Sequence, residues 1–353
     1  MAPMARLRKA DCSGPGIRRR RRGKGFEYFH DSGRKIKDAE VLRRIDELRI
    51  PPAWEEVWIC PLAHGHLQAT GVDAAGRKQY LYHQRWRERR DQQKFDEMID
   101  LARSLPKMRE RVARDLAGHD LRRERVLACA VRLLDRGFFR VGGEDYAVEN
   151  DSYGLATMRK EHVTVQRSGA ITFDYPSKSG QRRVQSVVDP DVHDVVRRLK
   201  RRRGGSEELL AYQDGRRWRD VKSGDINEYV KRVSGGDFSA KDFRTWNATL
   251  LAAVALAVSG QATQSKTGRK RAITRAVKEV ARYLGNTPAV CRASYIDPRV
   301  FDRFQDGLTI GGVLPTLVDE LERDSAALHG AAEEAVIDLI AEDVRSPALE
   351  KVA

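Results

Sequence analysis

The sequence predicts an α+β protein: a small β-rich N-terminal domain, then a mostly α-helical domain that contains a three-stranded antiparallel β-meander. Short apolar runs separated by Gly, Pro and Asp fill the first part, whereas helical periodicity dominates from about residue 91. Three alternating segments interrupt the helical part. The 353 residues suffice for two domains of ordinary size, and we expect the boundary near residue 90.

The first 90 residues are expected to form two parts. Residues 1–25 are rich in Arg, Gly and Pro without periodicity, which indicates a flexible basic arm. In residues 26–90 the runs GFEYF, VWIC, HLQATGV and KQYLYH read as short strands between turns. One helix is predicted over 38–50, with Asp38 as its N-cap.

Residues 91–353 carry helical patterns interrupted by the meander. Pro106 is expected to break the first helix, since proline removes a backbone hydrogen bond. The meander strands are predicted at 162–166, 170–175 and 182–188. The helices are predicted over 91–118, 122–137, 189–203, 223–235, 240–258 and 274–285, with the mostly apolar segment 240–258 buried.

A short helix is predicted over 288–296. Gly285 ends the helix before it, Thr287 can cap the new one, and Pro288 suits its first turn. Tyr295 then lies two turns after Pro288. By itself a tyrosine in such a place is more often a packing residue than a nucleophile.

The net charge is the first indication of function. Lys and Arg outnumber Asp and Glu by 66 to 51, which gives +15 and a pI near 9.8. The positive charge is clustered at 18–22, 197–203 and 266–271, whereas 319–343 is acidic. Clustered positive charge favours a polyanionic partner such as nucleic acid.

Several classes of protein are disfavoured. The longest apolar run, 250–258, is about half of the ~20 residues that a membrane helix needs. The N-terminus lacks a secretory apolar core, so we expect a cytoplasmic protein. The four cysteines are far apart, and the carboxylates show no two-metal spacing, so we expect no metal site.

Four motifs carry polar side chains that suit phosphate chemistry. They are FRVGGEDYAVEN with Arg140, SKSG with Lys178, KDFRTW with Arg244, and GNTPAVCRASYIDP with Asn286 and Tyr295. Guanidinium groups bind phosphate oxygens through two-pronged contacts. The segments RIPPAWEEVWICP and GHLQATGVDAAGRKQYLYH lie in the N-terminal part.

In their order, these motifs resemble type IB DNA topoisomerases, specifically the poxvirus-like bacterial branch, over roughly residues 15–310. The resemblance implies that the Tyr295 phenol attacks a DNA phosphorus and forms a 3′-phosphotyrosyl ester. It implies phosphate contacts from Arg140 and Arg244, a hydrogen bond from Asn286, and proton donation by Lys178. Many members have histidine where this chain has Asn286. Arg182 and Arg183 are near enough in sequence to leave the assignment of Lys178 open.

The resemblance also implies partners. It implies that the reaction requires neither a metal ion nor ATP. It also implies that the chain acts as a monomeric two-domain clamp on double-stranded DNA in the nucleoid. Alternate residues of a strand face one way, and Tyr80 and Tyr82 alternate in KQYLY. The candidate DNA contacts that it assigns are Gln79, Tyr80, Tyr82, Tyr146 and Lys241.

Two alternatives stay open. A tyrosine recombinase uses similar chemistry, but such enzymes usually have histidine three residues before the second arginine, where this chain has Lys241. A non-catalytic basic DNA-binding protein would also explain the charge. Relaxation of a supercoiled plasmid, without ATP and with EDTA, separates these readings.

Overall fold

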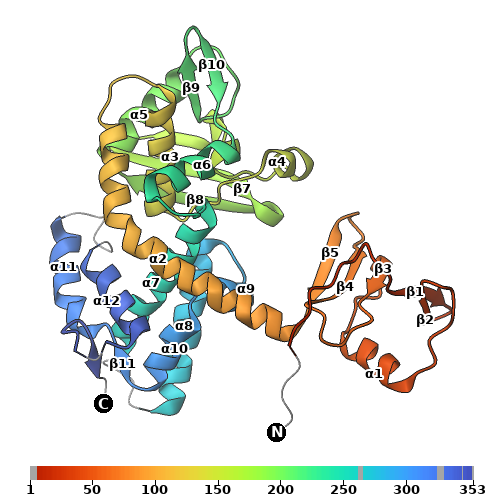
Figure 1. Ribbon diagram of the computed structural model, residues 1–353. Helices are drawn as coiled ribbons and strands as arrows, with labels where there is room; N and C mark the ends of the chain where they lie inside the picture. The colour runs from red at the N-terminus through yellow and green to blue at the C-terminus, as the bar shows by residue number, and fades with distance from the viewer. Residues whose placement is uncertain (1–5, 261–264, 324–329, 344, 352–353) are drawn as a thin grey trace. The chain divides into compact units, whose positions relative to one another are not determined.

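A computed structural model describes residues 6–260, 265–323, 330–343 and 345–351. The chain divides into two compact units, Met1–Lys94 and Phe95–Ala353 (Figure 1). The helical content of the second unit, the β-rich first unit and the antiparallel meander confirm the predicted α+β class.

The first unit is built on a five-stranded antiparallel sheet in the order β2-β1-β3-β4-β5. Helix α1 has its predicted N-cap, because Asp38 accepts hydrogen bonds from the backbone N–H groups of Glu40 and Val41. The elements are β1 (Ile17–Arg22), β2 (Gly25–His30), α1 (Ala39–Glu47), β3 (Glu55–Ile59), β4 (Leu67–Val72) and β5 (Lys78–Tyr82).

The expectation of a flexible arm over residues 1–25 is wrong for Ile17–Arg22, which form strand β1. Ile17 is 2% exposed and belongs to the core of this unit, so burial fixes the start of the strand. The arginines that follow are held by local partners. Arg18 forms an ion pair with Asp31, and the Arg19 guanidinium lies 4.1 Å from the centroid of the Phe26 ring.

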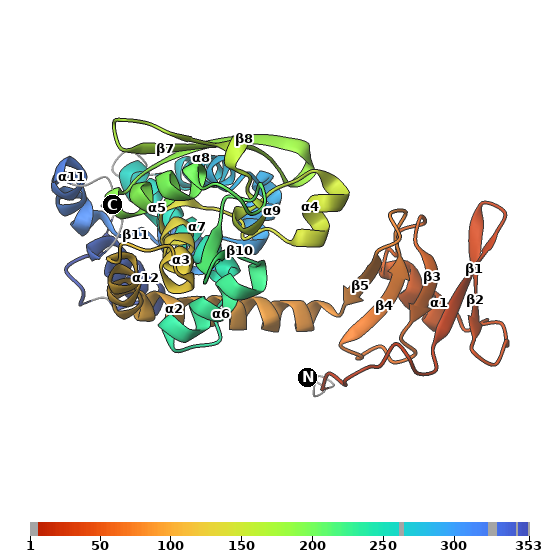
Figure 2. The same ribbon diagram turned by 90° about the horizontal axis from the view of Figure 1, so that it is seen from above.

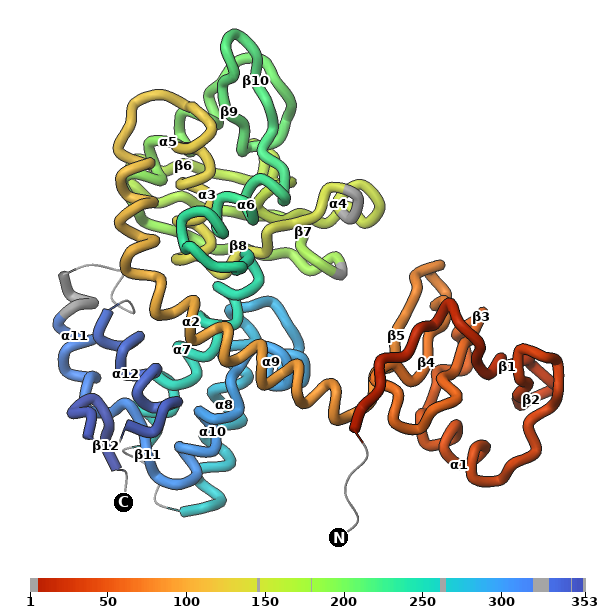
Figure 3. The backbone as a smooth tube through the Cα atoms, in the orientation of Figure 1, coloured from red at the N-terminus to blue at the C-terminus, as the bar shows by residue number. Residues whose placement is uncertain are grey.

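The second unit, whose backbone Figure 3 traces, contains most of the helices and the predicted meander. The strand order of the meander is β6-β7-β8. A hairpin, β9–β10, was not predicted, although its Asp-Gly turn is a known hairpin signal. The strands are β6 (Val163–Val165), β7 (Ala170–Ser177), β8 (Gln181–Val188), β9 (Ala211–Asp214), β10 (Arg217–Asp220), β11 (Leu308–Thr309) and β12 (Glu350–Lys351).

The predicted helices of the second unit are present in the predicted order, although the one expected over 274–285 begins at Lys266. Four further α-helices were not predicted: Glu144–Asn150, Pro298–Gln305, Leu314–Arg323 and Ala331–Ala341. The α-helices are α2 (Gln84–Leu116, which begins in the first unit), α3 (Arg123–Gly137), α4 (Glu144–Asn150), α5 (Pro190–Arg201), α6 (Ser223–Ser234), α7 (Ala240–Gly260), α8 (Lys266–Leu284), α9 (Pro288–Ser294), α10 (Pro298–Gln305), α11 (Leu314–Arg323) and α12 (Ala331–Ala341). The 3₁₀ helices are η1 (Leu155–Thr157), η2 (Lys160–His162), η3 (Lys178–Gly180) and η4 (Gly311–Val313).

The predicted break at Pro106 is wrong, because α2 continues through it. Leu105 and Met108 on either side are almost fully buried in the core of the second unit. The packing of this apolar stripe stabilises the helix by more than the loss of one hydrogen bond at Pro106 costs.

Helix α7 lies at the centre of the second unit, as its apolar sequence predicts. It packs against α8, α10, α12 and α3, and most of its residues are buried. Helices α3 and α5 pack against the meander (Figure 2). None of the helices in the described segments has the length and apolar character that crossing a bilayer requires.

A buried ion-pair network joins the acidic C-terminal part to this core. Arg109 on α2 contacts Asp135 on α3 at 2.9 Å and Glu333 on α12 at 2.6 Å. Glu333 also accepts a hydrogen bond from the Trp246 indole on α7 at 3.0 Å. Burial by itself lowers the pKa of Arg109. The hydrogen bonds and negative charges of Glu333 and Asp135 have a larger combined effect, so the pKa of Arg109 is raised.

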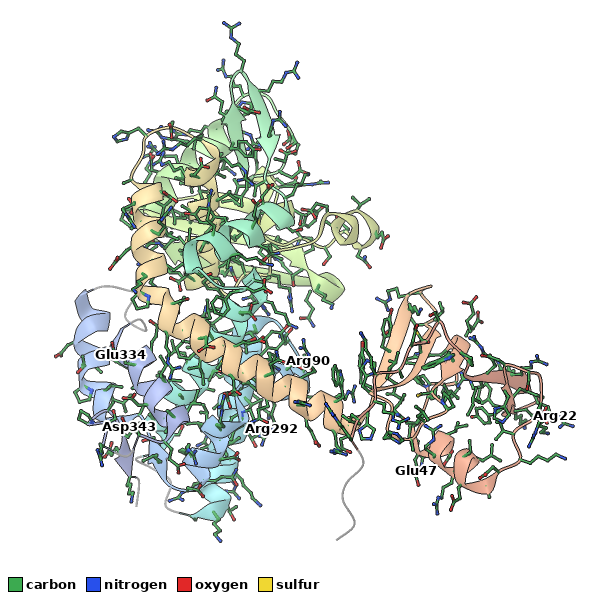
Figure 4. The ribbon with its side chains drawn as sticks, viewed as in Figure 1. Arg22, Glu47, Arg90, Arg292, Glu334 and Asp343 are labelled. Atoms are coloured by element: carbon green, nitrogen blue, oxygen red, sulfur yellow. The ribbon has the colours of Figure 1, made fainter. Side chains whose placement is uncertain are left out.

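We expect Glu333→Ala to lower the free energy of unfolding by about 3 kcal/mol, because it leaves the buried Arg109 charge without one partner. Urea unfolding measures this change. Glu334→Ala is the matched control: Glu334 is the next residue on α12, is exposed and is labelled in Figure 4. Its effect should stay within about 0.5 kcal/mol, and equal effects of the two changes would contradict the network's role.

Candidate active site

The site is organised around the C-terminal end of helix α8. Gly285 ends the helix in the left-handed conformation, with φ of +61°, as predicted. Asn286 follows, and its backbone N–H donates to the carbonyl of Ala281 at 3.0 Å. The last carbonyls of a helix have no intrahelical donors and carry a partial negative charge, so they attract cations.

Three arginines from different segments contact three consecutive carbonyls at this end. Arg183 on β8 donates to the carbonyl of Tyr283. Arg244 on α7 donates through Nη2 to the carbonyl of Leu284 at 2.9 Å. Arg140, in the loop after α3, donates through Nη2 to the carbonyl of Gly285 at 2.9 Å. The helix end therefore gathers three guanidinium groups beside Asn286.

The loop that carries Arg140 is held by contacts of the residues before and after it. Phe139 is fully buried and stacks edge-on against Phe173 of the meander. The Arg140 carbonyl accepts a hydrogen bond from the N–H of Leu155 at 2.8 Å. Gly142 has φ of +83°, and a β-carbon there would lie 2.9 Å from Cα of Gly154, so this close approach of two chain segments requires glycine. Arg140 is thus held by backbone contacts.

Arg244 is 4% exposed at the start of α7. Its Nη1 donates to the carbonyl of Phe138, and its guanidinium lies 5.4 Å from the centroid of the Tyr295 ring. Burial, reinforced by the neighbouring Arg140 cation, lowers the pKa of Arg244 to about 10. At neutral pH the group remains a cation, beside the phenol of Tyr295.

Tyr295 is the residue that follows the short helix α9. Thr287 caps this helix and Pro288 opens it, as predicted, but the helix ends at Ser294. The Tyr295 N–H donates to the Cys291 carbonyl at 3.0 Å, and its own carbonyl accepts from Thr249 Oγ1 at 3.4 Å. These contacts to α9 and α7 fix the backbone from which the half-buried phenol projects.

Donors at this site remain unpaired within the described residues. Arg140 Nη1, Arg244 Nε and Asn286 Nδ2 are buried and have no hydrogen-bond acceptor there. The Asn286 carboxamide oxygen accepts from Arg140 Nη2 at 2.6 Å, which leaves its NH₂ group available. Buried unpaired donors are costly, so three of them together indicate a site for an anionic ligand.

The structure brings four of the five expected catalytic residues into one cleft of about 300 Å³. Lys178 reaches it from η3 at the tip of the β7–β8 hairpin, and Lys241 from the first turn of α7. Asn286 does not line the cleft and joins the cluster through Arg140. The lining residues are Arg140, Val141, Gly142, Gly143, Ser152, Tyr153, Lys178, Ala240, Lys241, Arg244 and Tyr295.

The remaining expected residues lie elsewhere. The side chain of Tyr146, on α4, lies outside the described part of the chain. Tyr80 and Tyr82, on β5 of the first unit, are 45% and 37% exposed, and their rings stack with centroids 6.2 Å apart. Gln79 points to the other face of that strand and donates to Asp73 at 2.9 Å.

Arg183, which the sequence offered with Arg182 only as an alternative to Lys178, belongs to the arginine cluster, and Tyr175, which the sequence analysis did not name, packs beside it. Tyr175 is 2% exposed and is the cross-strand partner of Arg183. Burial raises the pKa of Tyr175, although Arg183, Arg140 and Arg244 oppose the shift. The sequence signal that could have identified Arg183 is the alternation of side chains along a strand. On β8, Arg183 lies on the same face as the buried Val187, whereas Arg182 lies on the opposite face.

Chemically, the cleft combines a phenol, the buried Arg244 guanidinium, the half-buried Arg140 guanidinium and an exposed lysine. Cations and N–H donors around one point stabilise a group whose negative charge increases during a reaction. A phenol beside them can act as a nucleophile, and a lysine can donate a proton to a leaving oxygen. The arrangement therefore suits phosphoryl transfer to tyrosine.

The chain is similar to known DNA topoisomerases. The family described as eukaryotic DNA topoisomerase I, catalytic core, matches residues 83–309, and bacterial DNA topoisomerase IB, N-terminal domain, matches residues 25–73. DNA topoisomerase 1B of Acanthamoeba polyphaga mimivirus is 32% identical, over 82% of this chain and 88% of the relative.

Two further relatives match over a shorter part of the chain. DNA topoisomerase 1 of Schizosaccharomyces pombe is 29% identical, over 45% of this chain and 19% of its own length. That of Daucus carota is 28% identical, over 39% of this chain and 16% of its own length.

We expect Gly285→Ala to destabilise the protein more than Gly215→Ala. Both glycines have similar positive φ, +61° and +58°, so each alanine adds a strain of about 1–2 kcal/mol. At Gly215, in the β9–β10 turn, a β-carbon meets nothing within 4 Å among the described atoms, whereas at Gly285 it lies 2.8 Å from Arg183 Nη1. Thermal unfolding measures both, and equal losses would contradict a tightly packed arginine cluster at Gly285.

Proposed function

The chain belongs to the type IB DNA topoisomerase family, and from this premise we propose how it acts. It relaxes supercoiled duplex DNA by cutting one strand, letting the duplex rotate, and rejoining the strand. The cut strand is held as a 3′-phosphotyrosyl ester, and neither ATP nor a metal ion takes part. The observation that carries the proposal is the convergence of Tyr295 with Arg140 and Arg244, whose buried donors lack partners within the described residues.

Tyr295 is proposed as the nucleophile. Its oxygen forms a bond to a backbone phosphorus while the bond from phosphorus to the 5′ oxygen breaks. The phenol proton leaves to water, and the protein stays joined to the 3′ end of the cut strand. The backbone hydrogen bonds of Tyr295 to Cys291 and Thr249 support this role, because they limit the positions from which the phenol can attack.

Arg140, Arg244 and Asn286 are proposed to stabilise the pentacoordinate phosphorus. Negative charge accumulates on its non-bridging oxygens, and the three unpaired donors of these residues can bind them. Asn286 contributes an uncharged N–H donor that cannot act as an acid or base near neutral pH. Binding the phosphate would also satisfy donors that are otherwise buried without acceptors among the described residues.

Lys178 is proposed as the acid that gives a proton to the leaving 5′ oxygen. It sits at the tip of an exposed hairpin and lines the same cleft as Tyr295. Religation is the reverse: the 5′-hydroxyl attacks the phosphotyrosine, Lys178 takes the proton back, and Tyr295 leaves. Because the ester replaces one phosphate ester bond by another, no external energy source is required.

DNA contacts away from the cleft are proposed for both units, each of which would hold one region of a monomeric clamp on the duplex. The stacked, exposed rings of Tyr80 and Tyr82 offer a surface for the DNA backbone or base edges. Gln79 reaches DNA only if its bond to Asp73 opens. Lys241, an exposed residue of the cleft lining, and Tyr146 are also proposed to contact phosphates.

The proposal predicts relaxation of a supercoiled plasmid by the purified chain in EDTA and without ATP. Tyr295→Phe should abolish relaxation and the covalent adduct seen after denaturation, yet still bind DNA in a mobility-shift assay, because only the phenolic oxygen is lost. Tyr212→Phe, on β9 outside the cleft lining, is the matched control and should relax normally. Failure of the folded wild type to relax DNA would overturn the function, and nicking by Tyr295→Phe would overturn the nucleophile.

Lys178→Ala should slow single-turnover cleavage by about 100- to 10,000-fold, the usual contribution of a positioned acid. A substrate in which sulfur replaces the bridging 5′ oxygen leaves without protonation, so it should restore most of the rate. Arg182→Ala, on the same hairpin with its side chain 75% exposed, is the control and should cleave both substrates normally. If the sulfur substrate does not rescue Lys178→Ala, the acid is another group.

A further inference from the structure

Strand β8 carries two adjacent arginines with different environments. Arg182 is 75% exposed and pairs at the surface with Asp174, with Nε 2.7 Å from a carboxylate oxygen. Arg183 points to the opposite face. It contacts the carbonyl of Tyr283 through Nη2 and the side chain of Gln185 through Nε at 2.7 Å. The two residues are therefore a natural comparison between a surface charge and an internal one.

Arg183 lies beside Gly285, the residue that ends α8 and precedes Asn286. A β-carbon on Gly285 would be 2.8 Å from Arg183 Nη1 and 3.8 Å from Arg140 Nη1, so both guanidinium groups pack against this glycine. Arg183 does not line the cleft that holds Tyr295; it lines a second cleft of about 450 Å³ with Arg136, Arg282 and Tyr283. Arg183 is therefore expected to act on the chemistry without touching the phosphate, by positioning Asn286 and Arg140 and through its charge.

We propose that Arg183 is a positioning residue for strand cleavage, an inference that rests on the proposed function. By holding the carbonyl of Tyr283, it fixes the end of α8, and with it the turn that directs the Asn286 amide and the Arg140 guanidinium toward the phosphate. It also places a permanent positive charge beside Gly285, the residue before the neutral Asn286.

The charge distribution favours this role. Arg140, Arg183 and Arg244 lie close together, and without DNA their repulsion is offset by the carbonyls of residues 283–285. A phosphate that gains negative charge during cleavage is attracted by all three cations more strongly than the starting phosphate is. The interaction therefore grows toward the transition state, and its loss should affect the cleavage rate more than the affinity for DNA.

The test measures single-turnover cleavage and, separately, DNA binding by Arg183→Gln and Arg182→Gln. We expect Arg183→Gln to cleave on the order of 100-fold more slowly, the cost of misplacing a reactive group by about 1 Å, with little change in DNA affinity. Arg182→Gln should cleave at the wild-type rate. Arg183→Lys keeps the charge but not the two-pronged contact, so its rate should lie between those of wild type and Arg183→Gln.

The 5′-sulfur substrate separates positioning from proton donation. It should not restore the rate of Arg183→Gln, because a better leaving group does not reposition Asn286; restoration would make Arg183 part of the acid and overturn the proposal. A wild-type rate for Arg183→Gln would also overturn it. If that variant unfolds in a thermal melt, Arg183→Lys decides: a reduced rate supports the proposal, and an unchanged rate refutes it. An inactive wild type would instead refute the proposed function.

Discussion

The site depends on one interaction: arginines from three separate segments contact the last three carbonyls at the end of α8. Three cations so close together would repel one another strongly in a buried setting. The partial negative charge of the helix end offsets that repulsion. Because each arginine has a defined acceptor, Arg140 and Arg244 are oriented before any substrate binds. The same contacts therefore offset the repulsion among the arginines and fix the positions of two guanidinium groups that line the cleft.

The surrounding fold holds the segments that supply these side chains. Helix α7 carries Arg244 and, through Thr249, contacts the backbone at Tyr295. Helix α3 leads into Arg140, and its residue Asp135 is tied by Arg109 to the C-terminal helix α12. The acidic C-terminal part therefore contributes to the core that supports the site, although its composition is opposite to the basic character of the chain as a whole.

Much of this could be predicted from the sequence, and the exceptions have physical reasons. The caps at Asp38 and Thr287 and the helix end at Gly285 follow from local chemistry, and they were confirmed. Strand β1 and the passage of α2 through Pro106 were missed, because tertiary packing outweighs local composition there. The place of Arg183 depends on which face of β8 meets the end of α8, a contact between residues about 100 positions apart.

The most direct test of this account is a crystal structure of the chain with orthovanadate and a nicked DNA duplex that lacks the phosphate at the nick. Vanadate adopts the five-coordinate geometry of the proposed transition state. We expect vanadium bonded to the Tyr295 oxygen, with its equatorial oxygens accepting from Arg140, Arg244 and the Asn286 amide, and with the three arginines still on the carbonyls of residues 283–285. Vanadate bound to another nucleophile, or arginines that leave the helix end to reach it, would contradict a site organised before DNA binds.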